Sequence, residues 1–161
     1  MHQLIGIVSH ADTVEQARDD ALTFADALVE RDELDYYLLD SDRWEQSGQT
    51  SSLASEAGRA ALAAARKANR DAFDRALRAV RMMLAHYTDE QIYQDDFPDD
   101  GRDYYAARYQ FAVIGGHTHD CYLYGDGSLW GGKLQNDTDY RLATGDLDPT
   151  ELWITNLDVH Y

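Results

Sequence analysis

Cysteine, lysine and long apolar runs are scarce in this chain of 161 residues. Its single cysteine, Cys121, excludes an internal disulfide. No apolar run approaches the roughly 18 residues that a membrane-spanning helix requires. The first residues lack the basic start and long apolar stretch of a signal peptide. We therefore expect a cytoplasmic protein without a membrane partner.

The length fits one domain with a core of ordinary size. Hydrophobic residues make up 44% of the chain and aromatic residues 11%, which excludes a disordered tail. There is no internal repeat, and no linker marks a boundary between two units. We expect residues 1–161 to form a single domain.

Negative charge dominates, because 30 acids face 14 bases and give a formal charge of −16. Aspartate supplies 23 of the acids. Such a surplus repels itself in dilute buffer but is screened in concentrated salt, where the Debye length is roughly 3 Å at 1 M. The composition predicts adaptation to a salty cytoplasm. An alternative is a nucleic-acid-mimicking inhibitor whose acids imitate phosphates, most densely over residues 89–103.

Positive charge is concentrated in residues 51–86, which carry seven bases against three acids and so a charge of +4, leaving −20 for the rest of the chain. The helical spacing predicts ion pairs between Asp71 and Arg75 and between Asp74 and Arg78. We expect this basic segment to be solvated or to pack on the protein's own acidic body; the alternatives are an acidic partner and nucleic acid. Nucleic acid is disfavoured as a partner, since phosphate contacts weaken steeply with salt.

The N-terminal third predicts a strand, a helix and a second strand. Residues 3–8 form a short apolar run, and Asp12-x-x-Glu15 and Thr13-x-x-Gln16 both resemble helix-capping boxes. Apolar residues then recur every three or four positions up to Leu28. Residues 35–40 read as the second strand, which completes a βαβ unit over residues 3–41 with a right-handed crossover.

A helical segment follows from Ser51 or Ser52 to about His86, with a break expected at 69–71. Thr88-x-x-Gln91 is a second capping box, before a short helix that ends near Gln94. Residues 95–103 read as a loop, 104–109 as a helical turn, and 111–114, 121–124 and 128–130 as short strands. A short helix after Thr138 and a strand over 152–161 close the chain.

This order of elements predicts an α+β fold with a mixed β-sheet, an N-terminal βαβ unit and helices on one side. The architecture we expect is a ferredoxin-like core with a helical insertion at about 51–94. The Asp35-Tyr-Tyr strand and the terminal run from Trp153 to Asp158-Val-His-Tyr161 resemble small uncharacterised proteins of halophilic archaea and their tailed viruses. The resemblance spans most of the chain, rests on no catalytic motif and implies an origin but no activity.

The run Gly115-Gly-His-Thr-His-Asp120 resembles the GHTH metal-ligand loop of calcineurin-like metallophosphoesterases. The other blocks of that family are missing, since Asp158-x-His160 comes after the run and no G-N-H block occurs. The chain is also too short for that two-sheet domain. No activity is carried over from this family.

The same residues still suggest a metal site. In an extended segment His117, His119 and Cys121 share one face, and Asp158 and His160 share one face of the terminal strand. If these strands are neighbours, His117, His119, Asp158 and His160 could bind a divalent transition metal such as zinc, manganese or iron. In the alternative, His117 and His119 lie in a turn and bind only solvent or backbone.

Three functions follow from the sequence. The first is a non-enzymatic accessory or interaction protein with a protein partner or a homodimer, because no phosphate-binding glycine loop, Ser-His-Asp order or paired-cysteine motif is present. The second is a metal-binding protein or metal-dependent hydrolase, in which bound metal activates water. The third is the nucleic-acid mimic.

Overall fold

The computed structural model describes residues 2–98, 104, 107, 110, 111, 122–124 and 140–160. They form an α+β fold, as predicted. Its elements are β1 (His2–His10), α1 (Val14–Glu30), β2 (Tyr36–Leu38), β3 (Thr50–Ser52), α2 (Glu56–His86), α3 (Asp89–Gln94), β4 (Tyr122–Tyr124) and β5 (Leu152–His160). Residues 140–144 add one short helical segment. None of the helices described is long and apolar enough to cross a membrane.

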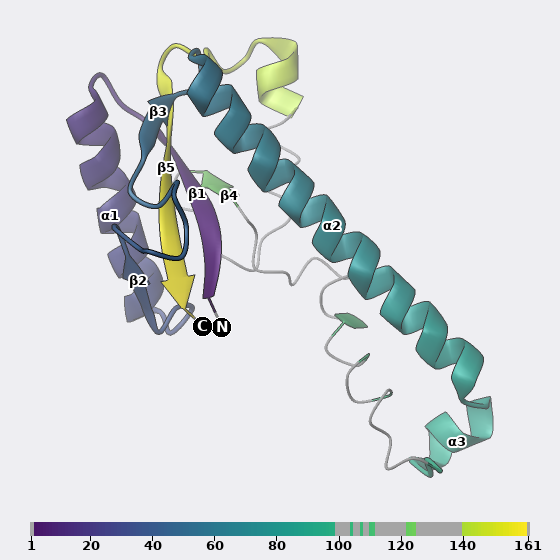
Figure 1. Ribbon diagram of the computed structural model, residues 1–161. Helices are drawn as coiled ribbons and strands as arrows, with labels where there is room; N and C mark the ends of the chain where they lie inside the picture. Colours follow the sequence, from purple (N-terminus) through teal and green to yellow (C-terminus); the bar gives the residue numbers. More distant parts are fainter. Residues whose placement is uncertain are drawn as a thin grey trace.

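The sheet is mixed, as predicted, and is built on the two long strands β1 and β5 (Figure 1). These run antiparallel in register from His2 opposite His160 to His10 opposite Leu152. Strands β2 and β3 both pair antiparallel with β5, and β4 pairs parallel with β1. Because β2 runs parallel to β1 with β5 between them, the β1–α1–β2 unit has the split arrangement of a ferredoxin-like core.

Helices cover both faces of this sheet, so the expectation of helices on one side is wrong (Figure 1). On the α1 face, Ile5, Ile7, Leu157 and Val159 pack in one cluster with the buried side of that helix. On the α2 face, a second cluster joins three apolar residues of the long strands to α2 and the 140–150 segment: Val8, Leu53, Leu62, Leu147, Leu152 and Ile154. Apolar residues at both odd and even positions of β1 and β5 make this possible, because alternate side chains of a strand point to opposite faces.

Two of the predicted helix starts are confirmed. The Thr13 hydroxyl accepts the backbone N–H of Gln16 at the start of α1. At α3 both halves of the capping box form, since the side chains of Thr88 and Gln91 each accept a backbone N–H of the other. These bonds satisfy N–H groups that have no partner within the helix, which fixes where each helix begins.

Helix α2 is one continuous helix, so the predicted break at 69–71 is wrong. Its pairs are Lys67 with Asp71 and Arg70 with Asp74, at 2.5 Å and 3.0 Å, instead of the predicted Asp71–Arg75 and Asp74–Arg78. The two ion pairs span residues 69–71 on adjacent turns and support the helix there. The start also differs, because Ser51 and Ser52 belong to β3 and Ser55 is the N-cap.

With 31 residues, α2 is about 46 Å long, at 1.5 Å per residue. Its first half lies against the sheet, and its second half continues beyond the sheet to α3 (Figure 1). We call residues 67–86 the arm. At its far end a small satellite core joins Met83, Tyr87 and Ala107, with Phe97 and Tyr104 packed against it.

The structure describes only some of the residues in the three short strands predicted over 111–114, 121–124 and 128–130. Strand β4 lies within the predicted strand 121–124. Phe111 is helical and does not begin a strand. The predicted strand over 128–130, like most of 111–114, lies outside the residues that the structure describes.

Candidate functional site

Of the four predicted metal ligands, the structure describes Asp158 and His160. His117 and His119 lie outside the described residues, as does Cys121. Asp158 and His160 do share one face of β5, because both meet His2 on the neighbouring strand. The Nδ1 atom of His2 lies 3.0 Å from Oδ1 of Asp158, and the rings of His2 and His160 are 5.0 Å apart between centroids.

Asp158 is fully buried, and three side chains hydrogen-bond its carboxylate. Besides His2, the Ser41 hydroxyl donates to Oδ2 at 2.5 Å, and Trp44 donates a further bond. Burial alone would raise the pKa of Asp158, but the hydrogen bonds from Ser41, His2 and Trp44 outweigh it and hold the pKa below its ordinary value. Asp158 is therefore ionised, and its carboxylate links β1 and the 39–49 loop to β5 as an ionised anchor.

Gly48 explains how that loop returns to the sheet. Its φ of +77° is a backbone conformation that glycine adopts readily. Its N–H donates to the carbonyl of Asn156 at 2.8 Å. A Cβ at this position would lie 2.7 Å from the carbonyl oxygen of Leu39. The loop can therefore place Ser41 and Trp44 against Asp158 while its end stays bound to β5.

His160 belongs to a second histidine–carboxylate pair beside the first. Its Nδ1 lies 2.9 Å from Oδ2 of Asp35, and the ring of Tyr36 stacks on it at 4.9 Å with 6° between the planes. The Tyr36 hydroxyl lies 3.4 Å from Nε2 of His2. His2, His160 and Tyr36 are directly paired across β1, β5 and β2, so three rings gather at one end of the sheet.

This cluster does not have the geometry of a Ser-His-Asp triad. Ser41 donates to the carboxylate, whereas a nucleophilic serine would bond the far nitrogen of the imidazole. Within the described part of the chain, no three His, Cys, Asp or Glu side chains come together in a way that could hold a metal ion. The sequence placed Asp158 and His160 on one face but missed His2, Ser41, Asp35 and Tyr36, whose approach depends on strand pairing.

A second candidate surface lies on the arm. Arg75, Arg78 and Arg81 are exposed, and none of them forms an ion pair with another described residue. We call these three residues the arginine stripe. Met82 lies beside it with 72% of its surface exposed. The hydrogen bond from Lys67 lowers the pKa of Asp71, and the charges of Arg75 and Arg78 lower it further.

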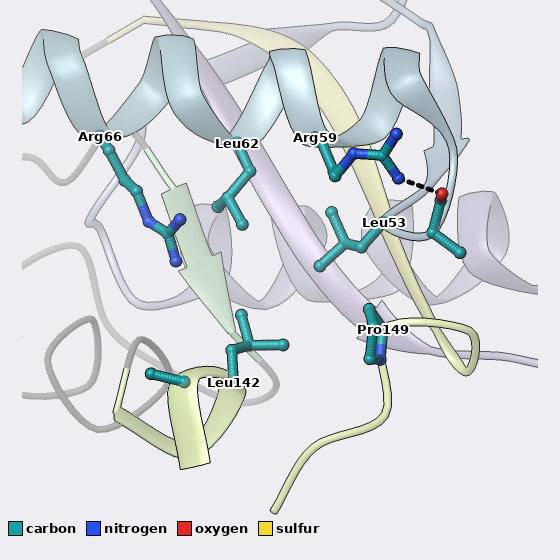
Figure 2. A pocket seen from close by; sticks show the side chains of 8 residues that line it. Leu53, Arg59, Leu62, Arg66, Leu142 and Pro149 are labelled. Atoms are coloured by element: carbon teal, nitrogen blue, oxygen red, sulfur yellow. Dashed lines mark hydrogen bonds between the residues drawn. The ribbon is translucent and has the colours of Figure 1, made fainter. Parts of the chain in front are cut away.

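A third feature is a pocket of about 780 Å³ between the first half of α2 and the 140–150 segment (Figure 2). We call it the α2 pocket. Its walls combine apolar side chains with two arginines: Leu53, Ala54, Arg59, Leu62, Arg66, Leu142, Ala143 and Pro149. A smaller hollow of about 400 Å³ beside Asp158 is lined by acids, Ser41, Ser47 and Trp44.

A family model described as "Domain of unknown function (DUF7995)" matches residues 1–161. No curated protein and no solved structure matches the chain.

Proposed function

This chain belongs to the family described as a domain of unknown function (DUF7995), and we propose that it works as a non-enzymatic interaction protein. The observation that carries this proposal is the arginine stripe of α2. It lies on a helix that continues beyond the sheet, where we propose that it binds acidic side chains of a partner. We propose a second copy of this chain as that partner.

Charge supports an acidic partner for the stripe. The chain has 30 acids and 14 bases, and the stripe places three arginines on one stretch of helix where none of them has an ion pair with a described residue. An arginine guanidinium binds carboxylates through two parallel N–H groups, so each member of the stripe can hold one acid. A partner rich in aspartate and glutamate would satisfy all three.

A second copy offers such a surface on α1. That helix carries five acids and one base over Val14–Glu30, a charge of −4, and its acids lie on the exposed side away from the sheet. In Figure 1, α1 and the arm lie on opposite sides of the sheet. A two-fold axis can therefore place the arm of each copy on α1 of the other copy. The same contact then forms twice, and the assembly ends at a dimer.

The acidic composition is compatible with this contact in concentrated salt, to which we propose the protein is adapted. Salt removes long-range attraction, but ion pairs at contact distance are screened less when they are partly buried. Salt also favours burial of apolar groups such as the exposed side chain of Met82. The interface we propose combines both.

Sedimentation equilibrium in molar salt tests the proposal. The variant R75Q/R78Q/R81Q should raise the dimer dissociation constant at least about tenfold, because the two-fold contact loses six exposed ion pairs of roughly 0.2–1 kcal/mol each. A control, R43Q/R141Q, removes two exposed arginines outside both α1 and the arm and should dimerise like the wild type. A wild type that stays monomeric at high concentration, or equal weakening by both variants, would refute the arm as the interface.

A metal-binding function is the second candidate. It is favoured by the way Asp158 and Asp35 hold the Nδ1 atoms of His2 and His160, since a carboxylate at the other ring nitrogen is typical of metal-binding histidines. His117 and His119 would complete the site with His160. Elemental analysis after purification without chelator should then find about one transition metal per chain, and H117A/H119A should lose it. Metal-free wild-type protein would refute this candidate.

A further inference from the structure

The exposed side of α1 carries a line of carboxylates. Glu15, Asp19, Asp26 and Glu30 are all exposed, and their spacing places them within an arc of about 60° around the helix axis. This arc lies opposite the buried side of α1. We call these four residues the acidic ridge. Asp20, the other acid of α1, falls outside the arc.

We propose that the acidic ridge is the surface of a second copy on which the arginine stripe docks. This inference rests on the proposed function and specifies which acids of α1 make the contact. From Glu15 to Glu30 the ridge is about 22 Å long, and from Arg75 to Arg81 the stripe is about 9 Å long, at 1.5 Å per residue. The ridge is therefore long enough for all three arginines, each of which can bind a carboxylate through two parallel N–H groups.

The fold leaves the carboxylates of the ridge available. Within the part of the chain that the structure describes, no hydrogen bond or ion pair engages the side chains of Glu15, Asp19 or Glu30. Asp26 accepts a hydrogen bond from the Tyr37 hydroxyl at 2.7 Å, which involves only its Oδ1 atom. Three of the four acids can therefore turn both of their oxygens toward a partner.

The acids of the ridge also repel one another within a single copy. Glu15 with Asp19, and Asp26 with Glu30, are like-charged pairs at the i, i+4 spacing, which destabilises a helix. Glu30 ends α1, where the helix dipole favours a base, and no base lies in that last turn. In α2 the same spacing carries opposite charges. Arginines of a second copy would offset the repulsion in α1, so the ridge becomes favourable in the assembly.

An exchange of charge between two copies tests the ridge. The reversed-stripe variant R75E/R78E/R81E and the reversed-ridge variant E15K/D19K/E30K should each raise the dimer dissociation constant at least about tenfold in molar salt. Asp26 is kept because Tyr37 binds it. An equal mixture of the two variants should dimerise within about threefold of the wild type, because both contacts of the mixed dimer join opposite charges. Sedimentation equilibrium measures all three samples.

A neutral variant separates binding from folding. E15Q/D19Q/E30Q removes the repulsion within α1, so it should unfold at the same temperature as the wild type or higher, yet dimerise more weakly. The control D42K/E45K/E56K changes three exposed acids outside α1 and should dimerise like the wild type.

The outcomes distinguish this inference from the proposed function. If the wild type dimerises and the reversed stripe weakens it, but the reversed ridge does not, the arm remains the interface and the ridge is refuted. A mixture of the two reversed variants that stays monomeric would also refute docking of the stripe on the ridge. A monomeric wild type would refute the proposed function itself.

Discussion

Asp158 shows how one residue of a common type can have an unusual position. Most of the 23 aspartates serve surface charge, but Asp158 is fully buried and accepts hydrogen bonds from three side chains. The sequence predicted that it shares a face with His160, because that follows from strand periodicity alone. It could not predict His2 or Ser41 as partners, since these come from segments 156 and 117 residues away.

Replacing Asp158 by Asn should therefore destabilise the protein. The variant keeps the shape but loses the charge that Ser41, His2 and Trp44 bind, so we expect a loss of about 1–3 kcal/mol in the free energy of unfolding. Urea denaturation at pH 7 measures it. The control Asp35→Asn alters an exposed pair and should cost less than about 0.5 kcal/mol. Equal losses in both variants would contradict the anchoring by Asp158.

The difference in unfolding free energy between the wild type and Asp158→Asn should depend on pH, because the pKa of Asp158 is lowered. Its native pKa lies below the ordinary value of 3.8, so the unfolded chain binds more protons in the acid range. The stabilisation is complete above the unfolded pKa and is lost as the pH falls through the native pKa. The gap between wild type and Asp158→Asn should therefore be widest at pH 7 and narrow below about pH 4. A gap that does not change with pH would count against the ionised anchor.

Among the helices, the sequence predicted the capping residues of α1 and α3 but not that α2 is continuous. Thr13 and Thr88 cap their helices as their sequence spacing indicated. The break expected at 69–71 is absent, because Asn and Asp are favoured at helix ends but ion pairs across two turns keep the helix intact. Local preferences therefore identified the starts of α1 and α3, but neither the start of α2 at Ser55 nor its continuity.

Gly58 gives a test of how α2 joins the sheet. A Cβ on this residue would lie 2.0 Å from the carbonyl oxygen of Ser52, the last residue of β3. Gly58→Ala should therefore lower the free energy of unfolding by more than about 2 kcal/mol, although alanine is the better helix former by about 1 kcal/mol. Thermal unfolding measures the change.

The control for Gly58 is the reverse change on the exposed side of the same helix. Ala63→Gly should cost only about 1 kcal/mol, the ordinary difference in helix propensity. If Gly58→Ala stabilises the protein, the backbone of β3 does not approach α2 as closely as described.

For the whole molecule, the sequence predicted the fold class, the mixed sheet and the helical insertion at about 51–94. It did not predict that helices cover both faces, because β1 and β5 each carry apolar residues on two sides and the pattern does not say which helix covers which. Composition located the basic segment, but only the structure separates its paired residues Lys67 and Arg70 from the arginine stripe. The proposed interface depends on that distinction.

Cross-linking between isotopically distinct copies tests the proposed interface most directly. Equal amounts of unlabelled and ¹⁵N-labelled protein are mixed in molar salt and treated with a carbodiimide, which joins lysine amines to carboxylates. Lys67 is the amine on the arm, so the account predicts mixed-isotope peptides that join Lys67 to acids of α1, and their loss in R75Q/R78Q/R81Q. Cross-links of Lys67 found only within single-isotope chains would contradict the account.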